Sequence, residues 1–335
     1  MKKFILCNAL VVLCASFLFL ASAQAGAKTK KLRLAYAGWE VGTAIAYIGI
    51  DAGIFKKYDL DVEEVFIRDA LTGGIQSLIG VDMVIGFGSP LSILQPILGG
   101  ADIVFLGSHV SLEQQGMGVS SGIETIKELK GKKIGVSALG GRSDLIARVI
   151  LRRAGLDPAE DVQIVSAGLA PSRVVALSKN LIQGAPLNAQ MASEARKLGL
   201  NVLELRDVPL TTALLMTTRS FIKKDEEAVR RFAKGYLAAI HHFLTRRAES
   251  IDIIRKYFTG TDPDAIEGMY DSFAAQLQPL PIPNRESTQS LIDAATVVDP
   301  KSKKIKPSEL FDTHFFEELK AGGFIEELYA EKVSL

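Results

Sequence analysis

The residues best suited to bind a small anion lie in the loop 137–144, directly before a long amphipathic helix. Two glycines leave its backbone amides open, Ser137 and Ser143 supply hydroxyl groups, and Arg142 supplies a cation. Free N–H groups at a helix start and an arginine suit a sulfonate, carboxylate or phosphate. The loop lacks the lysine of a triphosphate-binding loop. We therefore expect an anion here; the alternative is that Arg142 is a solvated loop residue.

A second polar loop, 86–90, has the sequence Gly-Phe-Gly-Ser-Pro and follows an apolar segment expected to be a buried strand. Ser89 is a typical helix cap, and Pro90 suits the first position of the helix expected over 91–98. Gly88 and Ser89 are candidates to bind an anion or a carbonyl oxygen. The alternative is an ordinary glycine-rich turn with a serine cap.

Three further candidates surround the loop 37–42. Trp39 offers a flat apolar face for stacking or for a cation–π contact. Glu40 could bind an amine, as a zwitterionic ligand would require, although a solvated loop acid is an equally ordinary role. Thr43 opens the following helix. The loop comes at the carboxyl end of a strand, where open α/β sheets bind their ligands.

Arg173 and Asn188 are candidates in the second half of the chain. Arg173 follows Pro171 and Ser172 at an expected helix start, where it could be a second anion partner or a surface residue. Asn188 ends the segment 183–188, which occupies the place of the loop 86–90 and precedes a helix expected over 187–198.

Groups for covalent or metal chemistry are scarce. His109 is one of four histidines and lacks Ser/His/Asp or His-x-x-x-His spacing, so we expect a solvated or hydrogen-bonded side chain. His241 and His242 diverge by about 100° on one helix and cannot share a metal. The only cysteines, Cys7 and Cys14, lie near the N-terminus. We expect no catalytic residues, no metal and no cofactor.

A βαβ unit over 32–67 must position the first candidates. Residues 32–36 alternate as in a strand, a helix with an apolar face starts at Thr43, and 62–67 form a second strand. The pattern recurs about 100 residues later, where Ile134 corresponds to Leu34 and Ser143 to Thr43. A repeat of this length indicates two similar lobes. The alternative is a loose alignment between unrelated βαβ runs.

The connections complete an expected α/β fold. Segments 111–120 and 208–218 are interpreted as two crossover strands between the lobes, and 103–106 as a strand ending at 107. From residue 225 the periodicity is helical, and these helices are expected on the first lobe. A Pro-rich connector, 277–283, could skirt the cleft between lobes.

The N-terminus resembles a secretory signal peptide, with a basic start, an apolar run over 4–20 and cleavage expected after Ala23 or Ala25. A membrane anchor is the alternative, but the run is barely long enough. The expected organisation is signal peptide 1–25, first lobe 28–117 and 209–335, and second lobe 118–208. A formal net charge of +1 indicates neither nucleic acid nor an anionic membrane as a partner.

The phrases AYIGIDAGIFKKYDLDVE, LGGADIVFLG and ELKGKKIGV resemble those of solute-binding proteins of ABC importers. They are most similar to the sulfonate/nitrate/taurine and thiamine-precursor group, SsuA/TauA and NMT1/THI5-like. The resemblance covers roughly Leu32 to Phe243 and implies a type II periplasmic binding protein fold. It implies a monomer in the periplasm that delivers a small, anionic solute to an ABC permease and its ATPase subunits.

The resemblance also implies that the loops carrying Trp39, Ser89, Ser137, Arg142 and Ser143 line the cleft. Two phrases depart from the family pattern, Gly80-Val81-Asp82 and the segment 179–183, so the identity of the ligand does not transfer. The Cys-rich iron motif of the related pyrimidine synthases is absent. The alternatives are a pyrimidine-binding protein and a lyase or synthase on the same scaffold.

Overall fold

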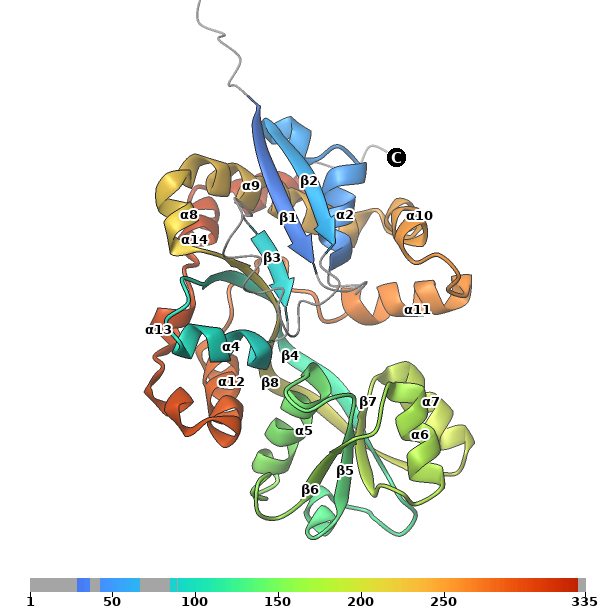
Figure 1. Cartoon of the computed structure of the whole chain (residues 1–335). Helices are drawn as coiled ribbons and strands as arrows, with labels where there is room; N and C mark the ends of the chain where they lie inside the picture. The colour runs from blue at the N-terminus through green and yellow to red at the C-terminus, as the bar shows by residue number, and fades with distance from the viewer. Residues whose placement is uncertain (1–28, 37–42, 67–84, 89, 331–335) are drawn as a thin grey trace, which may run out of the picture.

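The protein is described by a computed structural model that covers residues 29–36, 43–66, 85–88 and 90–330. These residues form two α/β lobes, one above the other in Figure 1. Lobe I carries the strands β1 to β3 and lobe II the strands β5 to β7, while β4 and β8 run through both. The expected α/β architecture with two crossover strands is confirmed.

One eight-stranded sheet connects the lobes, in the order β2-β1-β3-β8-β4-β7-β5-β6. Its strands are β1 Lys30–Tyr36, β2 Leu60–Phe66, β3 Ile85–Gly88, β4 Val104–Val119, β5 Lys133–Val136, β6 Gln163–Ser166, β7 Gly184–Leu187 and β8 Asn201–Thr217. The two crossover strands pair antiparallel over 16 and 17 residues, with register shifts where the chain passes between lobes.

The crossover strands are longer than the sequence predicts. Residues 107–109, expected to end a strand, lie inside β4, because β8 supplies hydrogen-bond partners along this whole stretch. Residues 86–88 belong to β3, and 184–187, expected as a loop, form β7 between β4 and β5. Glycine and proline are uncommon in the interior of strands, so the residue types of these short segments did not predict their pairing in the sheet.

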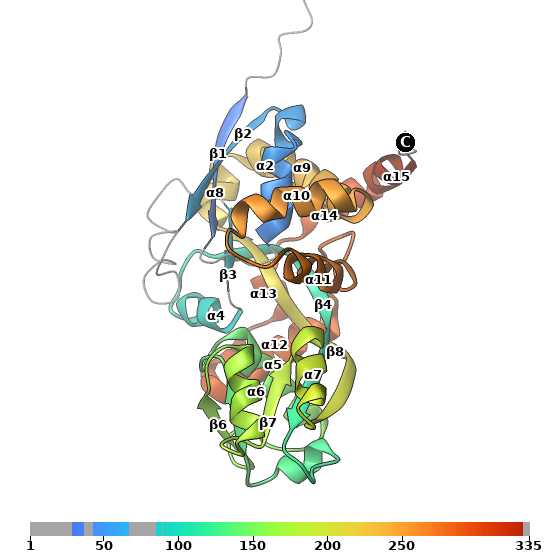
Figure 2. The ribbon, with the colours of Figure 1, turned by 90° about the vertical axis from the view of Figure 1, so that its right-hand side faces the viewer.

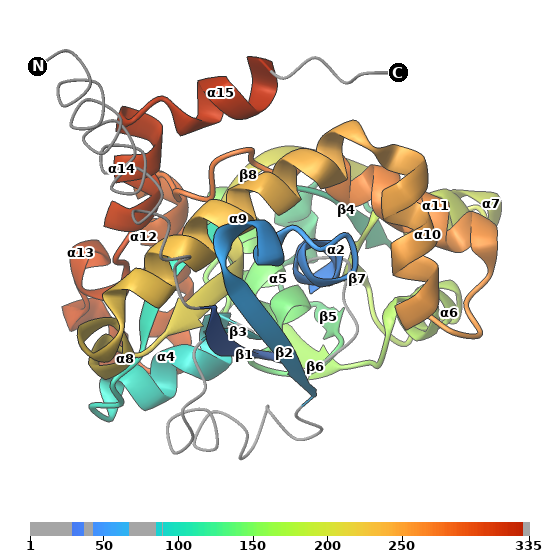
Figure 3. The same cartoon turned by 90° about the horizontal axis from the view of Figure 1, so that it is seen from above.

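The core of lobe I forms where helices from both ends of the sequence meet (Figures 2 and 3). Phe55 stacks on Phe232 of the long helix α9, with ring centroids 5.3 Å apart. The helical elements here are α2 Ala44–Asp51, η2 Phe55–Tyr58, α8 Arg219–Lys224, α9 Glu226–Thr245, α10 Arg247–Tyr257, α11 Pro263–Ala274, α14 His314–Ala321 and α15 Phe324–Ala330.

A second core joins lobe II to the region where the lobes meet. Leu291 and Ile292 of α12 share it with Leu145 and Ile146 of α5, so α12 reaches beyond lobe I, on which the C-terminal helices were expected. The elements involved are α4 Pro90–Leu98, η4 Ile126–Leu129, α5 Arg142–Arg153, α12 Arg285–Val298, η5 Pro300–Lys304 and α13 Pro307–Leu310. A smaller core lies under α6 Ala170–Ser178 and α7 Ala189–Lys197.

Two segments whose sequence pattern predicts a helix take another form. The amphipathic pattern over 308–320 predicts one helix, but the segment is divided between α13 and α14, because Phe311 leaves the helix to bridge Phe105 of β4. Ser121 with Glu124 three residues later predicts a capped helix over 123–129, but the segment contains only η4, which begins after Thr125.

The Pro-rich connector packs along β4 at the passage between the lobes. Ser108 N donates to Pro281 O at 2.9 Å, and Gln278 N donates to His109 O at 2.9 Å. Two backbone hydrogen bonds thus attach this connector to a crossover strand, and its expected position beside the cleft stays a prediction.

The expected lobe boundaries at 117/118 and 208/209 fall inside β4 and β8, so the division of the chain into those ranges stays a proposal. Among the described residues no helix combines the length and apolar character needed to cross a membrane. The expected signal peptide lies outside the described residues.

Candidate functional site

The carboxyl ends of the strands in the two lobes point toward each other. β1, β2 and β3 run parallel, and β3 is antiparallel to β8. β4 passes from lobe I into lobe II antiparallel to both β8 and β7, and β5 and β6 run parallel to β7. β1 to β3 therefore point toward lobe II and β5 to β7 toward lobe I, as their arrows show in Figure 1. Loops and helix starts from both lobes meet at these ends, the usual location of a ligand in α/β folds.

In lobe II, Ser137 and Ser143 form a hydrogen-bonded pair after β5. Ser143 Oγ accepts from Ser137 N at 2.7 Å, and the two hydroxyl oxygens lie 2.8 Å apart. One of the two hydroxyl groups donates its hydrogen to the other, so the hydrogen of the accepting hydroxyl can be donated to a further acceptor. The backbone amides at the start of α5 lie beside it, and this combination suits the oxygen of an anion.

The same loop is held by a buried carboxylate that sequence reasoning missed. Asp144 Oδ2 accepts from Gly140 N at 2.7 Å, and its other oxygen lies 2.8 Å from Arg148 Nε one turn later. Asp144 is fully buried and Arg148 nearly so. Gly140 has φ +76°, a conformation that glycine adopts at little cost. The i, i+4 spacing of Asp144 and Arg148 was the available signal.

Arg142 and Arg173 differ in their surroundings. Arg142 is exposed as the first residue of α5. Arg173 is buried, and its terminal nitrogens donate to Gly168 O at 2.9 Å and to Pro186 O at 3.0 Å. Burial lowers the pKa of the Arg173 guanidinium, although arginine remains charged. Arg173 thus links the loop after β6 to the end of β7, and its expected contact with a ligand stays a prediction.

Asn188 caps α7 directly after β7. Its side-chain oxygen accepts from Met191 N at 2.9 Å, which fixes one face of the amide group. The helix starts of α5, α6 and α7 thus follow β5, β6 and β7 at the same edge of lobe II. Helix N-termini carry partial positive charge, so this edge favours an anion.

In lobe I, Thr43 begins α2 and is buried. Its hydroxyl donates to Tyr47 OH at 3.0 Å, and Tyr47 stacks on Tyr257 of α10 with ring centroids 3.9 Å apart. Tyr36, the last residue of β1, donates to Glu64 Oε2 at 3.1 Å. Burial, reinforced by Glu64, raises the pKa of Tyr36 to about 12, so its hydroxyl stays protonated. The sequence analysis did not single out this tyrosine cluster.

The remaining candidates of lobe I are only partly described. Gly88 is the last residue of β3 and pairs with Leu214 of β8. Trp39, Glu40 and Ser89 lie outside the described residues, so their predicted contacts with a ligand are not tested.

Groups for covalent or metal chemistry remain few among the described residues. His109 is fully buried, with Nδ1 2.6 Å from Ala213 O and Nε2 bound to Tyr236 OH. Because a carbonyl only accepts, the hydrogen of the neutral ring lies on Nδ1, and Tyr236 donates to Nε2. His109 is therefore hydrogen-bonded and not solvated. Over the described residues no group of three or more His, Cys, Asp or Glu side chains could hold a metal ion.

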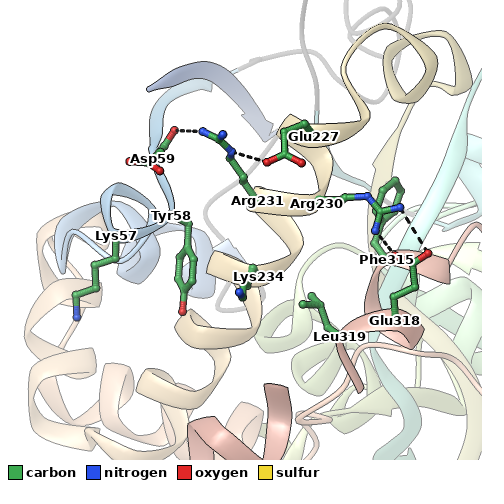
Figure 4. Close-up of a pocket in the computed structure, with 10 residues that line it drawn as sticks. All are labelled: Lys57, Tyr58, Asp59, Glu227, Arg230, Arg231, Lys234, Phe315, Glu318 and Leu319. Atoms are coloured by element: carbon green, nitrogen blue, oxygen red, sulfur yellow. Dashed lines mark hydrogen bonds and ion pairs between the residues drawn. The ribbon is translucent and has the colours of Figure 1, made fainter. Parts of the chain in front are cut away.

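A hollow on lobe I (Figure 4) lies away from the carboxyl ends of the strands. Asp59, which lines it, precedes the start of β2, the end opposite to the one where α/β folds usually bind ligands. Arg230 and Arg231 each pair with a glutamate one turn earlier on α9, at 2.7 and 2.8 Å, and Lys234 lies over an aromatic ring. We interpret this hollow as a solvated, ion-paired surface.

Comparison with known proteins gives one family and one fold. The family model described as "NMT1/THI5 like" matches residues 41–250. The aliphatic sulphonate binding protein SsuA of Escherichia coli is similar in structure, with a TM-score of 0.66 at 18% identity over 86% of this chain and 99% of that one. A putative sulfonate-binding SsuA of Methylobacillus flagellatus KT gives 0.66 at 17% identity, over 89% and 97%.

An enzyme shares the same fold. The desulfurization enzyme DszB matches with a TM-score of 0.61 at 14% identity, over 87% of this chain and 99% of that one. A comparison with curated protein sequences gives no match. At these identities the solved structures show that the fold is that of periplasmic binding proteins.

Proposed function

Because the chain belongs to the NMT1/THI5-like family, we propose that it is a solute-binding protein that holds a small molecule between its two lobes. The observation that carries the proposal is the opposed direction of β1–β3 and β5–β7, which brings the loops of both lobes to one cleft. A ligand that contacts both lobes stabilises the closed arrangement by the difference between its affinities for the closed and the open form.

The proposed ligand is a small anion such as a sulfonate, a carboxylate or nitrate. Three helix starts meet at the cleft edge of lobe II, and the Ser137–Ser143 pair has one hydroxyl hydrogen left to donate. Arg142 and Arg173 add positive charge at the same edge. The sulfonate-binding proteins named among the structural relatives support this class, although the fold alone does not determine the ligand.

The proposed contacts come from both lobes. Lobe I would contribute an aromatic face, hydroxyl groups and a carboxylate for an amine, and lobe II the anion-binding groups. The residues are Trp39, Glu40, Thr43, Gly88 and Ser89 from lobe I, and Ser137, Arg142, Ser143, Arg173 and Asn188 from lobe II.

The proposed cellular role is that of the binding component of an ABC importer. The protein would be exported, lose residues 1–25, act as a periplasmic monomer and deliver its solute to a permease coupled to ATPase subunits. Sequencing the N-terminus of the exported protein tests the first step, since cleavage after Ala23 or Ala25 is expected. An intact N-terminus in the periplasmic fraction would contradict it.

A thermal-shift screen followed by calorimetry tests the binding function. A molecule that binds only the native state raises the melting temperature, so methanesulfonate, taurine, benzoate, nitrate and an aminopyrimidine form a suitable panel. Ser143→Ala should weaken binding of the best probe, whereas Ser178→Ala, an exposed hydroxyl at the far end of α6, should not. Equal affinity in both variants would refute the assignment of the serine pair. A shift with the aminopyrimidine alone would favour the pyrimidine-binding alternative.

The second candidate is an enzyme on this scaffold, favoured by the similarity to DszB. Both cysteines precede the described residues, and the ring nitrogens of His109 are occupied by Ala213 and Tyr236. An enzyme would therefore need a base other than His109 and, once residues 1–25 are removed on export, a nucleophile other than cysteine. Release of a product from a bound probe, followed by chromatography, would establish the enzyme; recovery of the intact probe supports binding alone.

A further inference from the structure

A hollow of about 540 Å³ separates helix α11 of lobe I from helix α7 of lobe II. Gln190, in the first turn of α7, lines it from one lobe, and α11 lines it from the other. α11 lies above α7 in Figure 1, and the two helices lie close together in the view from above in Figure 3. The two helices therefore face each other across the opening between the lobes.

The face of α11 toward the hollow consists of small residues. Ala265, Gly268 and Ser272 are spaced three and four apart, so they share one side of the helix, while Ile266 and Tyr270 are buried on the other. Gly268 lies in the helix interior, where glycine is less favourable than alanine. A Cβ atom at Gly268 would meet nothing within 4 Å, so packing in this arrangement does not require glycine there.

The charges on the two sides are complementary. Asp262 and Asp264 line the hollow at the N-terminal end of α11, and both are exposed. The opposing end of α7 is a helix N-terminus, which carries partial positive charge and attracts acidic groups. Closing the hollow would bring unlike charges together.

We infer that the first turn of α7 docks on the Ala265–Gly268–Ser272 face of α11 when the lobes close. The inference rests on the proposed binding function, since it names the contact between the two lobes of this chain that forms when the solute is captured. The missing side chain at Gly268 lets the α7 backbone approach closely, and the register shifts of β4 and β8 supply the places where the connecting strands bend. The contact would thus form a latch at the side of the cleft.

Disulfide trapping tests the contact without any solute. In a chain carrying Cys7→Ser and Cys14→Ser, the pair Gln190→Cys and Gly268→Cys should be cross-linked by diamide about tenfold faster than the control pair Lys197→Cys and Gly268→Cys, because Lys197 ends α7 at its far end. The oxidised first pair should also have a smaller radius of gyration by X-ray scattering than its reduced form. Equal rates, or an unchanged radius, would overturn the inference.

Two substitutions at Gly268 separate the latch from the binding site. Gly268→Ala adds only a methyl group to this face and should weaken the binding of the best probe far less than a large side chain does. Gly268→Trp fills the hollow and should weaken that probe by about tenfold or more, while both variants remain folded. If the wild-type protein binds a probe and Gly268→Trp binds it equally well, the latch is wrong and the binding function stands. If no probe binds but the cysteine pair still closes the lobes, the latch stands and the proposed ligand class fails.

Discussion

Asp144 and Arg148 form an ion pair inside helix α5, with 2.8 Å between Oδ1 and Nε in a geometry that is not that of a hydrogen bond. The second oxygen of the same carboxylate accepts from Gly140 N, so one buried side chain attaches the loop 137–141 to α5. The arrangement places a carboxylate close to a predicted anion site. Arg148 offsets its charge, which keeps the site available to an anion.

Asp144→Asn should lower the free energy of unfolding by about 3 kcal/mol, because it leaves Arg148 largely buried without its carboxylate. Urea denaturation measures the change. The double variant Asp144→Asn/Arg148→Met removes both charges and should recover part of the loss. Additive losses in the double variant would show that the ion pair contributes nothing.

The free energy of unfolding should decrease as the pH falls below about 6.5, because His109 is buried in its neutral form. Burial lowers its pKa to about 4, below the value of about 6.5 in an unfolded chain, so the folded form resists protonation. The stabilisation is complete above about pH 6.5 and falls by at most about 1.4 kcal/mol per pH unit as the pH drops toward 4. Denaturation curves across this range measure the slope.

His109→Gln should flatten that slope. His242, whose pKa burial also lowers, contributes in the same direction and remains in the variant, so the slope should become smaller without vanishing. Asp102 and Asp225 have pKa values below their usual range and lose their contribution only under more acidic conditions. An unchanged slope in His109→Gln would contradict the assignment.

Gly268→Ala should raise the free energy of unfolding by about 0.5–1 kcal/mol, because glycine in a helix interior costs that much relative to alanine. The site has room, since nothing lies within 4 Å of the added Cβ. Gly235→Ala is a control with the opposite sign, because its Cβ would come within 2.7 Å of the Phe55 ring. Thermal denaturation of the two variants should therefore shift in opposite directions.

Arg142→Ala should weaken the binding of an anionic ligand by about 1.5–3 kcal/mol, the range of a hydrogen bond to a charged group. Arg152→Ala removes the same charge from the exposed far end of α5 and should change affinity little. Calorimetry with the best anionic probe measures both. Unchanged affinity in Arg142→Ala would remove this residue from the site.

Arg173→Lys should destabilise lobe II by about 1.5–3 kcal/mol, because a single ammonium group cannot reproduce the fork that reaches Gly168 O and Pro186 O. Arg153→Lys is the control; its one hydrogen bond, to Asp207 O, is exposed. Equal denaturation midpoints for the two variants would argue against the bridging role.

The sequence was informative where periodicity and position coincide. The βαβ unit, the crossover strands and the glycine-containing loop after β5 follow from alternation, glycine placement and repetition, and the structure confirms their places in the fold. The loop is shorter than predicted, because α5 begins at Arg142 and includes the last three residues of the segment 137–144. A strand before the loop 86–90 was predicted, but its extension through Gly88 was not, and β7 was missed, because both segments are rich in glycine or proline and only their neighbours in the sheet make them strands. Local residue type does not encode such tertiary pairing.

Side-chain partners were the least predictable part of the site. Arg173 was a reasonable anion partner by position, yet its terminal nitrogens bind carbonyl groups from two separate segments. His109 was expected to be either solvated or hydrogen-bonded, and only the second holds, through a link to Tyr236 that spans 127 positions along the chain. Contacts over such separations depend on the packing of whole elements, which a motif does not contain.

The pairing of β3 with β8 has a consequence for the order of synthesis. Gly86 lies opposite Met216, and the helices from α8 onward, which complete the core of lobe I around α2, follow that strand. The first lobe therefore cannot assemble while its early segments leave the ribosome, because roughly two thirds of the polypeptide must exist before its sheet is complete. During that delay lobe II, which occupies a continuous stretch of the chain, can fold first. Its strands β4 and β8 then provide the edge on which β3 of lobe I pairs.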